Sequence, residues 1–163
     1  MFSKFVRILQ SLTNVVVKGA SMDILYLDVK KAFDEVPHHR LSIKMRALGI
    51  GGELVTWIEN WLKGRKQKVV LNGEESDWVP VTSGVPQGSV LGPVLFVIFI
   101  NDLDDGIVNR IWKFADDTKV LAKVNCQKDI TDLQEDVKKL VSWSEKWQME
   151  FNVEKCKIMH EQK

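Results

Sequence analysis

The sequence predicts an α+β fold, in which helices cover one face of a sheet in a ferredoxin-like split βαβ arrangement. Short apolar, β-prone runs, "DILYLDV" and "RIWKFADDTKVLAKV", alternate with longer segments that have helical spacing. The second run contains a tight turn, which makes it a hairpin. The chain has 163 residues, 45% of them hydrophobic, and can bury the core of one globular domain without disulfides.

The first half of the chain predicts one strand among three helices. The expected elements are a helix over 2–17, a buried strand over 24–29, and helices over 38–50 and 53–63. Gly49 and Gly64 follow the last two helices as C-terminal caps would. The apolar face expected for the helix over 53–63 consists of Leu54, Trp57, Ile58, Trp61 and Leu62.

The second half predicts two hairpins and two helices. A hairpin over 67–81 turns at Asn72-Gly73, since both residues tolerate positive φ. A glycine-rich loop leads into an apolar helix over 89–101. Residues 110–124 form two strands around a turn at Ala115–Thr118, and a strand over 157–160 closes the sheet. The helix expected over 129–147 buries Ile130, Leu133, Val137, Leu140, Val141 and Trp147.

Composition narrows the class of protein. The net charge of +1 is lower than that of dedicated nucleic-acid-binding domains. The basic run Lys63, Arg65, Lys66 and Lys68 is either a solvated surface or a local nucleic-acid contact. Cys126 and Cys156 form no CxxC pattern, so each is expected to be a small buried hydrophobe in a reducing compartment. We see neither a signal peptide nor a membrane-spanning run, and we expect an intracellular protein, nuclear or cytoplasmic, without membrane contact.

Three aspartates stand at places where an isolated charge would be costly. Asp28 ends the apolar strand, while Asp116 and Asp117 are adjacent between apolar flanks. An exposed turn, a helix N-cap or a bound cation would each tolerate the pair, and Asp28 could cap the turn that follows it. If the sheet gathers all three carboxylates, these hard oxygen ligands would select Mg²⁺ or Mn²⁺. Two such ions would support an in-line displacement, which is the chemistry of nucleotidyl transfer.

Four ordered motifs carry a family resemblance. "LDVKKAFDEVPHHRL", "SGVPQGSVLGPVLFVIFINDL", "FADD" and "FNVEKC" resemble motifs A, B, C and D of reverse transcriptases, in the style of jockey-type non-LTR retrotransposons (LINEs). The similarity runs from about Asp23 to Met159. It implies an RNA-directed DNA polymerase core that uses an RNA template, a DNA primer, dNTPs and two Mg²⁺ or Mn²⁺ ions.

The resemblance implies a catalytic and metal-binding set. Asp28 and Asp116 would hold the metals together with the backbone carbonyl of Val29. Asp117 would be a weaker or positioning ligand. Lys155 would steer the triphosphate or protonate the departing pyrophosphate; its other interpretation is an exposed turn lysine.

A second set would contact nucleotide and template. Phe33 would lie under the incoming sugar and favour dNTP over rNTP, although an isolated Phe is also a common core residue. Pro86, Gln87 and Gly88 would touch the nascent base pair, and the same loop could simply be a helix entry. Ala115 belongs to this set, at a position where retroviral enzymes usually carry a larger residue.

The resemblance also predicts the domain organisation. We expect a residual fingers-side helix over 1–22 and a polymerase palm over 23–163, with fingers and thumb largely missing. The alternative function is a catalytically inactive retrotransposon-derived remnant that binds metal or nucleic acid weakly. A small phosphate-transferring enzyme would leave "SGVPQGS" unexplained. The oligomeric state does not follow from the sequence.

Overall fold

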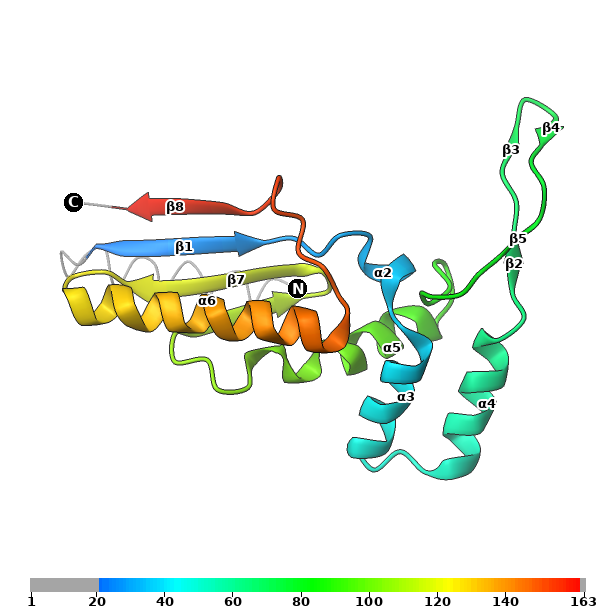
Figure 1. Ribbon diagram of the computed structural model, residues 1–163, viewed down its shortest axis with the longest axis horizontal. Helices are drawn as coiled ribbons and strands as arrows, with labels where there is room; N and C mark the ends of the chain where they lie inside the picture. The colour runs from blue at the N-terminus through cyan, green and yellow to red at the C-terminus, as the bar shows by residue number, and fades with distance from the viewer. Residues whose placement is uncertain (1–20, 162–163) are drawn as a thin grey trace. The chain divides into compact units, whose positions relative to one another are not determined.

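The computed structural model describes residues 21–161 (Figure 1). The helix expected over 2–17 lies outside the described residues. The described chain forms two compact units. The first contains residues 21–29, 104–144 and 151–161, and the second contains residues 30–103 and 145–150.

The first unit is built on a four-stranded antiparallel sheet in the order β6-β7-β1-β8. Its strands are β1 (Met22–Leu27), β6 (Arg110–Phe114), β7 (Asp117–Lys123) and β8 (Lys157–Glu161). Figure 1 shows β1 between β7 and β8. The β6–β7 hairpin therefore lies on one side of β1 and the last strand on the other, which is the strand order of a split βαβ unit.

The long helix α6 (Gln127–Trp147), whose residues up to Ser144 belong to the first unit, buries only part of the expected stripe. Its buried residues are Leu133, Asp136, Leu140 and Trp143, whereas the expected Ile130, Val137 and Val141 are exposed. Asp136 can be buried because its carboxylate accepts hydrogen bonds from the backbone N–H groups of Val108 and Asn109, at 2.9 and 2.8 Å. A polar residue thus occupies the buried stripe that hydrophobicity alone assigned to its apolar neighbours.

The second unit contains three helices that pack around apolar side chains. They are α3 (His38–Ala47), α4 (Gly52–Leu62) and α5 (Leu91–Phe99), with the short α2 (Ala32–Glu35) before them and the 3-10 helix η1 (Asn101–Asp104) after them. The fully or nearly fully buried core side chains include Leu41, Met45, Val55, Leu62, Leu95, Phe96 and Phe99. Burial of each such side chain contributes about 1.5–3 kcal/mol.

The buried face of α4 agrees in part with the one expected from hydrophobic spacing. Ile58 and Leu62 are buried as expected, but Leu54 and Trp57 are each 53% exposed. Val55, which was not expected on this face, is fully buried. The helix carries more apolar residues than one face can bury, and packing against α3 selects positions spaced by three and four residues.

A narrow β-ribbon follows α4 and confirms the expected hairpin (Figure 1). It pairs β2 (Lys66–Gln67) with β5 (Val79–Pro80), and β3 (Val70–Leu71) with β4 (Glu74–Glu75). The turn residues Asn72 and Gly73 have φ of 52° and 87°, as a type I′ turn requires.

Two of the four residues of the basic run, Arg65 and Lys68, bind other groups of the chain. Arg65 donates to the carbonyls of Leu62 and Gly84, and Lys68 forms an ion pair with Glu75. Lys63 and Lys66 are exposed.

Two smaller expectations can be compared with the structure. Cys156 is half-buried, but Cys126 is exposed, so its expected burial is wrong. It lies just before the start of α6, where the backbone turns at the surface. Among residues 21–161, no helix combines the length and apolar character needed to cross a bilayer.

Candidate active site

Three aspartates lie at one end of the sheet in the first unit. Asp28 follows the last residue of β1, and Asp116 and Asp117 lie at the turn between β6 and β7. The last pair of the β1–β7 ladder is Leu27 with Thr118. Continuing this antiparallel register by one residue sets Asp28 opposite Asp117, with Asp116 in the adjoining turn. Strand pairing therefore brings the backbones of the three aspartates to the same end of the sheet.

The hairpin turn is tighter than expected. It consists of Ala115 and Asp116 alone, because Asp117 already pairs with Phe114. Ala115 has φ of 52°, while Asp116 does not have positive φ. Positive φ at the first central position only is the pattern of a type II′ turn, in which glycine is the usual residue.

The loop before β8 brings a cation to Asp28. The Lys155 ammonium lies 3.5 Å from the Asp28 carboxylate. The loop is held by backbone contacts, since the Asn152 N–H donates to the Asp28 carbonyl at 2.8 Å. Asn152 in turn accepts from the N–H groups of Lys155 and Cys156. The position of Lys155 is thus built into a turn that is tied to the end of β1.

The donor atoms at this end of the sheet suit a hard divalent cation by their chemistry. Besides the carboxylates, the Val29 carbonyl is a further candidate oxygen ligand. Val29 forms an isolated antiparallel bridge with Phe151. The hydrogen bonds of that bridge use the Asp28 carbonyl and the Lys30 N–H, which leaves the Val29 carbonyl outside the pairing. Within residues 21–161, however, His, Cys, Asp and Glu side chains form no group of three or more that could hold a metal ion. The metal ligands therefore stay a prediction.

The nucleotide-contact set, apart from Ala115, lies in the second unit. Phe33 is half-buried and stacks on Phe96, with ring centroids 4.8 Å apart and planes inclined by 22°. The Val85 N–H donates to the Phe33 carbonyl at 2.7 Å, so the loop of Pro86, Gln87 and Gly88 starts beside Phe33. The structure brings these residues together. Phe33 packs on Phe96, as expected of a core residue, while its contact with a nucleotide sugar stays a prediction.

Gly84 anchors this loop, and its position in the structure can be occupied only by a glycine without strain. Its φ is +83°, and an added Cβ would lie 2.5 Å from the Asp34 carbonyl oxygen. Its own carbonyl accepts from Arg65 at 2.6 Å and lies 2.8 Å from His38 Nε2. The side chain of Gln87 reaches back to Asp34, with Nε2 to Oδ1 at 3.2 Å. Sequence reasoning passed over Asp34, although it directly follows Phe33 in the quoted motif.

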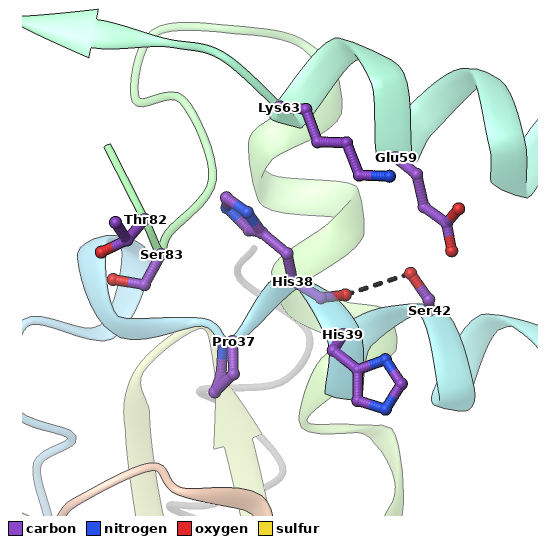
Figure 2. A pocket seen from close by; sticks show the side chains of 8 residues that line it. All are labelled: Pro37, His38, His39, Ser42, Glu59, Lys63, Thr82 and Ser83. Carbon is purple, nitrogen blue, oxygen red and sulfur yellow. Dashed lines mark hydrogen bonds between the residues drawn. The ribbon is translucent and has the colours of Figure 1, made fainter. Parts of the chain in front are cut away.

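A pocket of about 580 Å³ lies beside this loop in the second unit (Figure 2). Figure 2 shows side chains of α3 on one side and of α4 on the other, with the loop before Gly84 completing the wall. None of its lining residues belongs to the expected site: they are Pro37, His38, His39, Ser42, Glu59, Lys63, Thr82 and Ser83.

His38 is the half-buried member of the pocket wall. Burial lowers the pKa of its imidazole; the Gly84 carbonyl acts in the opposite direction, and the charge of Arg65 adds to the lowering. A neutral ring with the proton on Nε2 fits this environment, because it can donate to the Gly84 carbonyl. His38 is therefore a structural support of the loop.

The sequence comparisons agree with the motifs. A family model described as "Reverse transcriptase (RNA-dependent DNA polymerase)" matches residues 6–163. The chain is 37% identical over 140 residues to the RNA-directed DNA polymerase from mobile element jockey of Drosophila funebris, and 36% identical over 141 residues to that of Drosophila melanogaster. It is 31% identical to a probable RNA-directed DNA polymerase from transposon X-element of Drosophila melanogaster. In each case the match covers 80% of this chain and 15% of the relative.

A solved structure shares the fold. Telomerase from Candida tropicalis, determined with a fragment of telomeric RNA, superposes with a TM-score of 0.67 at 13% identity. The superposition covers 98% of this chain and 29% of that protein. The resemblance to jockey-type mobile elements is confirmed by these relatives, and the chain belongs to the reverse transcriptase (RNA-dependent DNA polymerase) family.

Proposed function

We propose that this chain is the palm-centred catalytic core of an RNA-directed DNA polymerase, which joins dNTPs to a primer 3′-hydroxyl along an RNA template. The observation that supports the proposal is the strand register, which places Asp28, Asp116 and Asp117 at the same end of an antiparallel sheet. Because the chain spans 15% of its jockey relatives, their activity is proposed for it and not transferred to it.

In this proposal Asp28 and Asp116, with the Val29 carbonyl, would hold two Mg²⁺ or Mn²⁺ ions, and Asp117 would position them. The bound ions would activate the attacking hydroxyl and stabilise the leaving oxygen. Lys155 supplies a positive charge beside Asp28, where it can steer a triphosphate or give a proton to the departing pyrophosphate.

The second unit would hold the nucleotide. Phe33 is half-buried and would lie under the incoming sugar, where a 2′-hydroxyl would clash with its ring. Pro86, Gln87 and Gly88 would contact the nascent base pair. Gly88 is exposed at φ of +78° with open space around its Cα, so backbone can approach a base closely there. Ala115 in the hairpin turn would complete the contacts to nucleotide or template.

Primer extension tests the proposal directly. The folded chain is given an RNA template, a DNA primer, dNTPs and Mn²⁺, beside Asp116→Asn and the matched control Asp105→Asn. Asp105 is an exposed aspartate that does not belong to the set of Asp28, Asp116 and Asp117. Since even outer partners of metal ligands contribute about 10–100-fold, Asp116→Asn is expected to lower the rate by more than about 100-fold. Asp105→Asn should leave extension unchanged.

Two results would contradict the proposal. One is extension that survives in Asp116→Asn, which would locate the chemistry elsewhere. The other is a folded wild-type chain that extends no primer. The chain would then be a folded member of the family without polymerase activity of its own, and metal binding measured by titration calorimetry would show whether the carboxylates still bind Mn²⁺.

A further inference from the structure

We propose that Asp34 is a positioning residue for nucleotide selection: it fixes the side-chain amide of Gln87 so that the amide oxygen faces outward. The inference rests on the proposed function, and it assigns a role to a residue outside the set that the sequence predicts. Its basis is the contact between Gln87 Nε2 and Asp34 Oδ1 at 3.2 Å.

The chemistry of the two groups decides which way the amide turns. A glutamine amide has one acceptor end and one donor end, whereas an ionised carboxylate only accepts. Asp34 can therefore face the NH₂ end of Gln87 alone. The amide oxygen is left pointing away from Asp34, with one N–H still available beside it. Gln87 would thus offer an acceptor to a donor group of a bound nucleotide.

Asp34 can act as a fixed reference because the loop is joined to its backbone. The Ser83 hydroxyl donates to the Asp34 carbonyl at 2.8 Å. The Gly84 N–H donates to the carbonyl of Val36, also at 2.8 Å. An added Cβ on Gly84 would meet three backbone atoms of Asp34 at 2.5–2.7 Å, so the two segments are in direct contact.

Because Asp34 and Gln87 are exposed, their contact can orient Gln87 without stabilising the fold to a large extent. Asp34 and Gln87 are both exposed, so their hydrogen bond competes with water and contributes little to the free energy of unfolding. What the bond removes is the rotamer freedom of a long glutamine side chain, a cost that a nucleotide contact would otherwise have to meet on binding. Phe33 directly precedes Asp34 in α2, so the residue proposed to sense the sugar and the residue proposed to orient Gln87 belong to the same short helix.

The first test needs no activity. In NMR spectra of the whole ¹⁵N-labelled chain, the Gln87 side-chain amide is the signal that disappears in Gln87→Ala. In Asp34→Ala this signal should move toward the position of a free glutamine, while the backbone amides of Gly84 and Val85 stay in place. An unmoved Gln87 signal would overturn the inference. So would equal shifts of Gly84 and Val85, because Asp34 would then hold the whole loop. Asp105→Ala serves as the control.

The second test uses extension kinetics. Asp34→Ala and Gln87→Ala should each raise KM for dNTP about tenfold with kcat nearly unchanged, and the double variant should be no worse than either. Asp34→Asn keeps an acceptor oxygen and should recover most of the loss. Additive losses would mean that Asp34 acts independently of Gln87 and would overturn the inference. If wild type extends no primer, the proposed function fails, while the NMR result still decides whether Asp34 orients Gln87.

Discussion

The Lys155 ammonium lies 3.5 Å from the carboxylate of Asp28, although one residue precedes the last strand and the other follows the first. The Val29–Phe151 bridge and the hydrogen bond from Asn152 to the Asp28 carbonyl bring the two segments together. Lys155 is 67% exposed and Asp28 is 23% exposed. A pair this exposed contributes little to stability, so the proposed role of Lys155 in chemistry can be tested without a large loss of stability.

Replacing Lys155 should separate activity from stability. In Lys155→Ala we expect the free energy of unfolding in urea to change by less than about 1 kcal/mol. The rate of nucleotide addition should fall by about 10²–10⁴-fold, which is the range for loss of a positioned general acid. Lys157→Ala, in an exposed position of β8, is the control and should keep its rate. A loss of rate matched by a comparable loss of stability would show that Lys155 is structural.

Gly84 and Gly88 make a matched pair, because both have positive φ but only one is crowded. An added Cβ on Gly84 would lie 2.5 Å from backbone, whereas one on Gly88 would meet nothing within 4 Å. Gly88→Ala carries the left-handed strain alone and should cost about 1–2 kcal/mol. Gly84→Ala must also displace the loop from Asp34 and should cost more than about 3 kcal/mol. Equal losses in urea unfolding would show that the loop yields without cost.

Strand pairing could be predicted from sequence further than helix packing. The end of β1 at Asp28 and the tight turn at Asp116 follow from short apolar runs and flanking polar residues, and these suffice to place the three aspartates at one end of the sheet. The buried faces of α4 and α6 depend on what packs against them. Val55 is buried although it lies outside the expected face, and Asp136 is buried because its carboxylate accepts hydrogen bonds from Val108 and Asn109, which are distant in sequence.

In the candidate site, too, some residues could be predicted from the sequence and others could not. Motif spacing pointed to Phe33 and Gln87 separately, but nothing local to either residue predicts that Asp34 bonds Gln87. That contact exists because Gly84 packs on the Asp34 backbone, which requires both segments in place. The same holds for Arg65, which seemed part of a basic surface and instead donates to the Gly84 carbonyl. Side chains that support a site through a second loop escape a search for motifs.

Ala115 offers a test of strain in the hairpin turn. Its φ of 52° is unfavourable for an L-residue, and a type II′ turn prefers glycine at this position. Ala115→Gly removes that strain but adds freedom to the unfolded chain, which costs about 0.4–1 kcal/mol. We expect a net gain of up to about 1 kcal/mol in thermal or urea unfolding. A clear loss would mean that the methyl group makes contacts worth more than the strain. Gly106→Ala, a glycine at φ of +74° with nothing near its Cα, is the reverse control and should destabilise.

His38 predicts a loss of stability in mild acid. Burial, with help from Arg65, holds its pKa below the ordinary 6.5, so the folded state favours the neutral ring. The unfolded chain takes up the proton first, and stability therefore falls as the pH drops below about 6.5. In His38→Gln this part of the pH dependence should vanish, whereas His39→Gln, an exposed neighbour, should retain it. Parallel urea curves for wild type and His38→Gln between pH 7.5 and about 5 would contradict the assignment.

Asp136 predicts a separate loss at lower pH. Burial alone would raise the pKa of its carboxyl, but hydrogen bonds from Val108 and Asn109, with the charge of Lys139, outweigh burial and hold the pKa below the ordinary 3.8. The charged form thus stabilises the folded state fully above about pH 3.8, and this contribution disappears as the pH falls through the lowered value. Asp136→Asn turns an amide donor toward backbone donors and should cost about 2–3 kcal/mol at pH 7.

The difference in unfolding free energy between wild type and Asp136→Asn should therefore shrink when the pH is lowered below about 3.8, as the wild-type carboxyl takes up its proton. Glu135→Gln is the control on the same helix, because Glu135 is exposed and pairs with Lys138; its effect should stay within about 0.5 kcal/mol at every pH. If the cost of Asp136→Asn were the same at pH 7 and in acid, the stabilisation would come from the shape of the side chain, and the charge of Asp136 would play no part in fixing α6 to the start of β6.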